Sequence, residues 1–147
     1  MYKTILVPLD GSKEAETIMD YIEELAGRLQ ARVLILHIFE EPMILRDDEV
    51  IDVSAQQQKQ RQKQTESYLK GVQKKLGEKG IEALYYIAYG PVVRTILIVA
   101  EQHDVDLIAL SSRGLNGSFG SVWTSVTARL LQRIRCPVFL VRYENDE

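Results

Sequence analysis

The segment Leu110–Val126 (LSSRGLNGSFGSVWTSV) combines glycines and hydroxyl side chains with a single charge, Arg113. A connection between a strand and a helix usually takes about 2–6 residues, whereas this one is about ten residues long. Its glycines would let the backbone adopt positive φ and approach a ligand closely. Thr124 and Ser125 place hydroxyls near the predicted start of a helix, where unpaired backbone amides bind anions. Arg113 adds a charge suited to a phosphate.

Two interpretations of this segment are open at the level of sequence. It is either a phosphate-binding cradle, or a slack Ser/Gly loop in which Ser121 or Thr124 caps the following helix. Neither the G-x-G-x-x-G pattern nor the Walker A pattern is present, so the glycines alone do not decide between them.

A second candidate lies early in the chain, where Asp10 stands in the sequence PLDGS. Its carboxylate could accept a hydrogen bond from an adenine-type amino group or a ribose hydroxyl, or help to hold Mg²⁺. The alternative is structural, with the aspartate capping a helix or tying the turn. Pro8 lacks an amide hydrogen and should therefore mark the carboxyl end of the preceding strand.

Both candidates follow nearly continuous apolar runs, Thr4–Asp10 and Val105–Ser112, which predict strands buried on both faces. The other predicted strands are Arg32–Phe39, Glu82–Gly90 and Cys136–Arg142, and the predicted helices are Ser12–Leu29, Gln56–Gly80, Val92–Asp104 and Ser121–Ile134.

This alternation predicts an α/β fold: one doubly wound domain over residues 1–147, with a five-stranded parallel sheet and helices on both faces. In such sheets ligands bind beyond the carboxyl ends of the strands, where the strand order reverses. If the order is 3-2-1-4-5, the reversal lies between the first and fourth strands. Asp10 and the segment Leu110–Val126 would then meet at one crevice.

Residues 40–55 mix acidic and apolar side chains without a clean period, which indicates a connector with some helical or lid-like character. The Gln/Lys-rich opening of the helix Gln56–Gly80 is polar on every side. A solvated helix extension is the simpler interpretation, and an interaction segment is the alternative.

Composition excludes several classes of function. A net charge of −3 argues against a nucleic-acid or anionic-membrane partner recognised by bulk charge. No apolar run is long enough to span a membrane, no signal peptide is evident, and the single cysteine cannot form an internal disulfide. A cytoplasmic location is therefore expected. His37 and His103 lack partners at metal-ligand spacing, so no protein metal site is predicted.

Five sequence segments together resemble the universal stress protein family: ILVPLDGS, ILHIFEEP, the YGP before the third helix, DLIALSSRG, and SVT-ARLLQRIRCPVFLVR. The resemblance covers essentially the whole chain. It implies a Rossmann-like fold of the adenine nucleotide alpha hydrolase type with strand order 3-2-1-4-5. It also implies a homodimer formed through the edge strand Pro137–Arg142.

Nucleotide-binding members of this family carry G-x2-G-x9-G-(S/T), which falls here on Ser111, Gly114 and the pair Thr124-Ser125. The spacing is kept, but serine and threonine replace two of the glycines. The substitutions either cost affinity or add hydrogen bonds. The resemblance further implies base and ribose contacts from Pro8, Asp10 and Ile38, and phosphate contacts from Ser111, Gly114, Ser125 and Val126.

The resulting expectation is a cytoplasmic protein that binds ATP or AMP, with or without Mg²⁺, in a stress-response or signalling role. Catalysis would be absent or limited to slow ATP hydrolysis. The alternative is a dimeric interaction module of the same fold, with a vestigial pocket and an unknown protein partner. A true enzyme such as an adenylating ligase would need catalytic residues that this sequence does not display.

Overall fold

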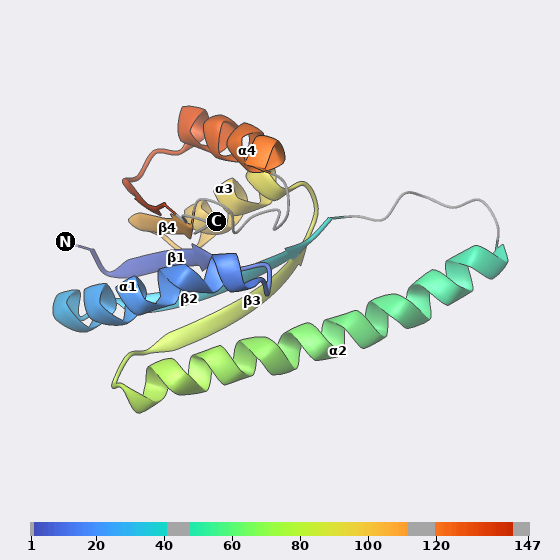
Figure 1. Cartoon of the computed structure of the whole chain (residues 1–147), viewed down its shortest axis with the longest axis horizontal. Helices are drawn as coiled ribbons and strands as arrows, with labels where there is room; N and C mark the ends of the chain where they lie inside the picture. The colour runs from blue at the N-terminus through green and yellow to red at the C-terminus, as the bar shows by residue number, and fades with distance from the viewer. Residues whose placement is uncertain (1, 41–47, 112–119, 143–147) are drawn as a thin grey trace, which may run out of the picture.

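The computed structural model describes residues 2–40, 48–111 and 120–142, and within these ranges it does not describe the side chains of residues 13–15, 48–55 and 120–126. Five parallel strands form one sheet in the order β3-β2-β1-β4-β5, as predicted. Strands and helices alternate along the chain (Figure 1): β1 Thr4–Pro8, α1 Lys13–Leu29, β2 Arg32–Phe39, α2 Asp48–Glu78, β3 Ala83–Tyr89, α3 Val92–Gln102, β4 Leu107–Ser111, α4 Gly120–Arg133 and β5 Val138–Val141.

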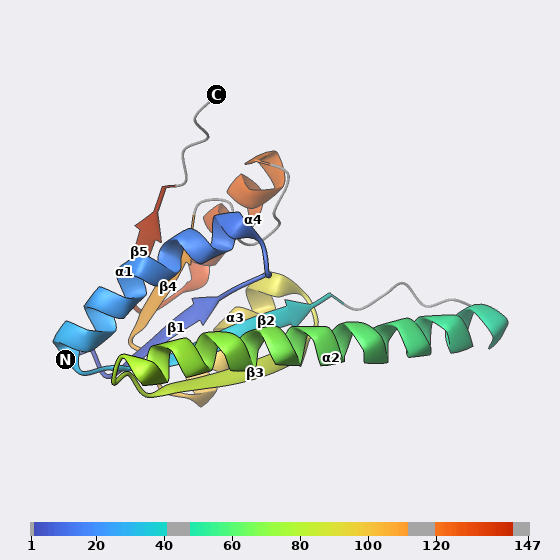
Figure 2. The same cartoon turned by 60° about the horizontal axis from the view of Figure 1, so that its bottom comes forward.

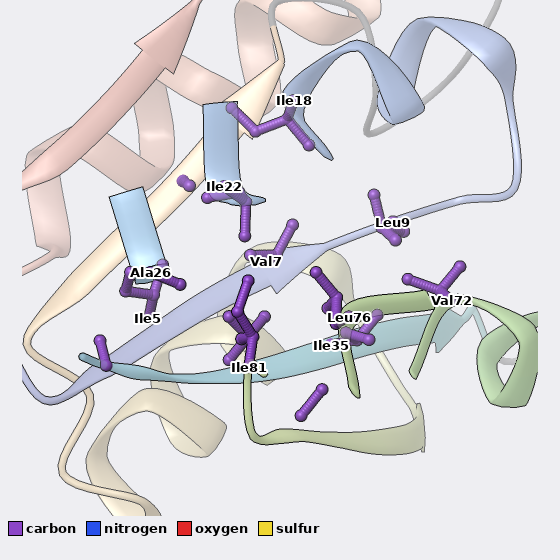
Figure 3. Close-up of a cluster of buried hydrophobic side chains, with 14 of the residues drawn as sticks. Ile5, Val7, Leu9, Ile18, Ile22, Ala26, Ile35, Val72, Leu76 and Ile81 are labelled. Carbon is purple, nitrogen blue, oxygen red and sulfur yellow. The ribbon is translucent and has the colours of Figure 1, made fainter. Parts of the chain in front are cut away.

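The sheet separates two apolar cores, because successive side chains of each strand point to opposite faces. On one face the strands pack against α1 and α2, with Ile22 and Leu76 fully buried. Figure 3 shows this core, in which side chains from both helices meet β1 and β2. On the other face Leu6 and its neighbours pack against α3 and α4, with Ile96 and Leu130 fully buried. These two cores hold the carboxyl ends of the central strands at one rim.

The predicted strands match the observed ones closely, and β1 ends at Pro8 as expected. The largest difference concerns α2, which begins at Asp48 rather than at Gln56. Residues 48–55, predicted as a connector with some helical character, are therefore helical, whereas residues 41–47 lie outside the described part of the chain.

Helix α2 is longer than the sheet that it covers. Figures 1 and 2 show its amino-terminal part extending past the carboxyl ends of β2 and β3. Its buried apolar side chains, Leu69, Val72 and Leu76, lie in the carboxyl-terminal half of the helix. In the described ranges, no helix is both long and apolar enough to cross a bilayer.

Candidate functional site

The strand order reverses between β1 and β4, which pair directly through Ile5–Leu107 and Leu6–Ile108. Their carboxyl ends, at Pro8 and Ser111, therefore lie at the same rim of the sheet. This is the position at which open parallel sheets bind ligands, and the strand order that puts it there is the predicted one.

Asp10 occupies the turn that leaves β1. Its Oδ1 accepts a hydrogen bond from the Ser12 amide at 2.9 Å, so the aspartate does tie the turn. Gly11 permits this turn by adopting φ of +86°. The Ser12 carbonyl oxygen then accepts the Glu16 amide, and α1 begins. The structural interpretation of Asp10 is thus correct for one oxygen, and Asp10 also lines a hollow at the rim.

Ser111, the last residue of β4, is 4% exposed, and its side chain lies on the α1 face of the sheet. Its Oγ lies 3.1 Å from the Thr17 Oγ1 of α1. This contact joins residues 94 positions apart, and sequence patterns gave no sign of it. The Ser111 hydroxyl therefore contributes to packing the end of β4 against α1.

Ile38 lies on β2 just past the end of the β1–β2 pairing. On β2 the Leu36 carbonyl oxygen accepts the Leu9 amide on the β1 side, and the Phe39 carbonyl oxygen accepts the Gly90 amide on the β3 side. Because successive residues of a strand bond to opposite neighbours, Ile38 faces β1, as Leu36 does. The pairing of β1 with β2 ends at Pro8–Leu36, so the Ile38 N–H and C=O lie beyond the last pair, on the β1 side of β2.

The remaining predicted contacts belong to the segment after β4. Arg113 and Gly114 lie outside the described residues. Thr124, Ser125 and Val126 lie within α4, which begins at Gly120, and their side chains are not described. In a helix starting at Gly120, the unpaired amides belong to its first turn. Contacts from these five residues to a phosphate stay predictions.

Helix α2 forms a further wall of the rim, which the sequence interpretation missed. A hollow of about 340 Å³ is lined by Asp10, Gly11 and His37 on the sheet side and by Gln64, Thr65 and Tyr68 on the α2 side. The signal available in the sequence was weak. Thr65 and Tyr68 lie one helical turn apart and share a side with Leu69 and Val72, the side that turns towards the sheet.

His37 holds the end of β1 through its Nδ1, which lies 3.0 Å from the Leu9 carbonyl oxygen. A carbonyl can only accept, so Nδ1 carries the hydrogen and Nε2 is an acceptor in the neutral ring. Burial lowers the pKa of His37, and the Leu9 bond and the charge of Asp10 oppose this effect without reversing it. The imidazole is therefore neutral at pH 7.

Tyr68 brings a buried hydroxyl to the same hollow, and this hydroxyl has no hydrogen-bond partner among the described residues. Burial raises the pKa of Tyr68 far above its ordinary value, and the negative charges of Glu16 and Asp10 raise it further. Glu16 lies close enough to act on the phenol without meeting hydrogen-bond geometry. At neutral pH, Asp10 is thus the one charged group among the residues that line this hollow.

A second hollow, of about 220 Å³, lies at the end of β2 and β3 and is lined by Ile38, Phe39, Glu40, Gln58, Arg61, Tyr89 and Val92. Phe39 stacks on Tyr89 with ring centroids 5.4 Å apart. The Arg61 guanidinium lies over the Phe39 ring, 6.0 Å from its centroid. Ile38, near the carboxyl end of β2, is thus part of the lining of this hollow.

Comparison with known proteins gives a consistent result. The model of the Universal stress protein family matches residues 1–142. The universal stress protein YxiE of Bacillus subtilis is 30% identical over 151 residues, covering 97% of this chain and 100% of YxiE. The universal stress protein Sll1654 of Synechocystis is also 30% identical, over 96% of this chain and 86% of its own length.

Solved structures show the same fold. The structure of MJ0577, a universal stress protein of Methanocaldococcus jannaschii, superposes with a TM-score of 0.85 at 24% identity and covers 99% of both chains. A universal stress protein in complex with cAMP gives a TM-score of 0.68 at 19% identity, over 95% of this chain and 96% of that chain. One from Archaeoglobus fulgidus in complex with dAMP gives 0.65 at 17%, over 95% and 98%.

Proposed function

This chain belongs to the universal stress protein family, and we propose that it binds an adenine nucleotide, ATP or AMP, in a cytoplasmic stress-response or signalling role without fast catalysis. One observation carries the proposal: at the carboxyl ends of β1 and β2, next to the reversal of strand order, Asp10 lines one hollow and Ile38 lines another. The complexes of two structural neighbours with cAMP and dAMP support an adenine nucleotide as the ligand class.

The polar groups at the crevice suggest an orientation for the bound nucleotide. A peptide N–H and C=O side by side, as at Ile38, match the adjacent acceptor and donor on the edge of adenine. Asp10 accepts hydrogen bonds from ribose hydroxyls. The phosphates would then extend towards the start of α4, where the helix dipole and the amides of its first turn favour anions. In this arrangement Pro8 lines the base side, and Ser111, Arg113, Gly114, Thr124, Ser125 and Val126 surround the phosphates.

A Mg²⁺ ion, if bound, would arrive with the nucleotide. Among the described residues, no three His, Cys, Asp or Glu side chains come together as a metal site. Mg²⁺ is commonly held by substrate phosphates with one or two carboxylates, and Asp10 is the carboxylate at this rim. In that case the phosphates would hold the ion and Asp10 would add one carboxylate, as an alternative to its contact with the ribose.

The Asp10 variants test the proposal. Asp10→Asn keeps an oxygen that can accept the Ser12 amide, so the turn survives while the charge is lost. We expect about 10–100-fold weaker ATP or AMP binding in isothermal titration, since hydrogen bonds to charged groups contribute about 1.5–3 kcal/mol. Asp10→Ala should bind no more tightly than Asp10→Asn. Asp20→Asn, which removes an exposed carboxylate of α1, is the matched control. Unchanged affinity in Asp10→Asn would refute the role assigned to this residue.

A second candidate function is an interaction module with a vestigial pocket. It is favoured by the departure of Ser111 and Thr124 from the glycines of nucleotide-binding relatives, and by the engagement of Ser111 with Thr17. The α2 extension would then serve an unidentified protein partner. Absence of binding heat with millimolar ATP and AMP would favour this function over the first.

We further propose a homodimer that forms through residues Pro137–Arg142. Strand β5 (Val138–Val141) stands at the edge of the sheet, so its outer backbone groups are available to a second copy.

A further inference from the structure

Helix α2 is fixed at the rim by an aromatic cluster beside the proposed base site. The Tyr89 hydroxyl donates to the Gln62 Oε1 at 2.8 Å, Tyr89 stacks on Phe39, and the Arg61 guanidinium lies over the outer part of this stack. Figure 2 shows α2 passing the carboxyl ends of β2 and β3. Arg61 is therefore held at the rim although it belongs to the polar half of the helix.

No acidic residue lies within one helical turn of Arg61 along α2. Positions three and four residues away on either side are Gln57, Gln58, Gln64 and Thr65, and none of them is acidic. The ion pairs formed by the described side chains, Arg28–Glu24 and Lys79–Glu23, do not include Arg61. Glu40 lines the same hollow without pairing with Arg61. A guanidinium has five donors and stays charged at all physiological pH values, so Arg61 retains donors for a ligand.

The hollow beneath Arg61 adjoins Ile38, the residue whose peptide groups would read a base edge. Its volume of about 220 Å³ is below the roughly 300–1,000 Å³ of sites that enclose a whole ligand. It therefore suits part of a ring system. Of the rings of nucleotides, the fused purine reaches farther from the ribose than the single ring of a pyrimidine.

We infer that Arg61 is a specificity-determining residue of the nucleotide site, which contacts the far end of a purine base and so selects purine over pyrimidine nucleotides. The inference rests on the proposed function. A guanidinium can contact a purine in two ways: through hydrogen bonds to ring acceptors, and through cation–π contact with the aromatic face. Gln58, from the same face of α2, adds an amide group that can both donate and accept hydrogen bonds in the hollow.

The test compares ATP with CTP, which carry the same sugar and phosphates, in isothermal titration with the full chain. Wild type should bind ATP at least about tenfold more tightly than CTP. Arg61→Met keeps an unbranched helix-forming side chain but removes the charge. It should reduce the ATP/CTP preference about fivefold or more, with the CTP affinity within about twofold of wild type, given the usual strength of cation–π and charged hydrogen bonds.

Two matched variants separate contact from general charge and from structure. Lys63→Met removes an exposed cation of the same helical turn that lies on the outward face, and it should change neither affinity. Tyr89→Phe breaks the bond to Gln62 but leaves the guanidinium, and it should keep most of the preference. If Tyr89→Phe loses as much of the ATP/CTP preference as Arg61→Met, the hydrogen bond between Tyr89 and Gln62 and not the guanidinium is responsible. The inference is then overturned.

Three other outcomes have distinct meanings. Equal weakening of ATP and CTP in Arg61→Met would overturn the inference, because Arg61 would then act on the phosphates or on the helix as a whole. Equal affinity of wild type for ATP and CTP would overturn it while leaving nucleotide binding in place. If wild type binds neither nucleotide, the inference and the proposed function both fall.

Discussion

Asp10 shows how one residue can serve the fold and a proposed ligand site together. One carboxylate oxygen closes the turn onto Ser12, and the carboxylate still borders a hollow of the rim. A sequence pattern offers these as alternatives, because PLDGS fits a capping aspartate and a ligand acceptor equally well. The geometry removes the conflict, since a carboxylate has about four acceptor positions and the turn uses one.

His37 should make stability depend on pH in a predictable direction. Burial lowers its pKa below the ordinary 6.5, so the native state resists a proton that the unfolded chain accepts. The free energy of unfolding should therefore fall as pH decreases from about 7.5 to 5.5, the interval around the unfolded pKa. In His37→Gln, an amide that can still donate to Leu9 replaces the titrating ring, and this fall should be smaller. Urea unfolding at both pH values measures the free energy of unfolding. An equal fall in wild type and His37→Gln would contradict the role assigned to His37.

At the scale of elements, α2 marks the limit of what the sequence predicts. Its carboxyl-terminal half was predictable from the helical spacing of Leu69, Val72 and Leu76. Its start at Asp48 was not, because residues 48–55 mix acids and apolar side chains without a period. The position of α2 beside the carboxyl ends of the strands could not be predicted either. Local patterns identify the buried face of a helix but not how far the helix extends past the sheet.

The turn between β3 and α3 has a specific requirement for glycine. Gly90 adopts φ of +142°, and a Cβ there would lie 2.9 Å from the Thr95 Oγ1. Gly90→Ala should therefore lower the free energy of unfolding by about 1–3 kcal/mol. Gly71→Ala is the matched control, because Gly71 lies inside α2 and a Cβ added there would meet nothing within 4 Å. It should raise stability by about 0.5–1 kcal/mol. Chemical denaturation checks both, and a Gly90→Ala protein as stable as wild type would disprove the requirement.

The overall fold follows from patterns that are visible in the amino-acid sequence. Continuous apolar runs such as Thr4–Pro8, buried at every position, can lie only in the middle of a covered sheet. Their alternation with helices leaves a parallel doubly wound sheet, and the rim between β1 and β4 follows from the strand order. The contact of Thr17 with Ser111 does not follow, because it depends on how α1 lies across β4 and not on any local pattern.

The two edges of the sheet provide an internally controlled test of assembly. Leu140 on β5 is 38% exposed, and Leu84 on β3, at the opposite edge, is 39% exposed. If the chain dimerises through Pro137–Arg142, Leu140→Glu places two charges in an apolar seam and should produce a monomer. Leu84→Glu adds the same charge at the same exposure and should leave the dimer intact.

Sedimentation velocity at micromolar protein distinguishes the species, because a dimer has twice the 16.8 kDa mass of the chain. Wild type and Leu84→Glu should both sediment as dimers, and Leu140→Glu should sediment near the mass of one chain. A monomeric wild type would exclude the β5 dimer. Dissociation in Leu84→Glu with an intact Leu140→Glu dimer would move the interface to the β3 edge, beside the rim hollow that contains Phe39, Tyr89 and Arg61. If that interface also reached Tyr89, at the carboxyl end of β3, it would cover the proposed base end of the site, and nucleotide affinity would then depend on protein concentration.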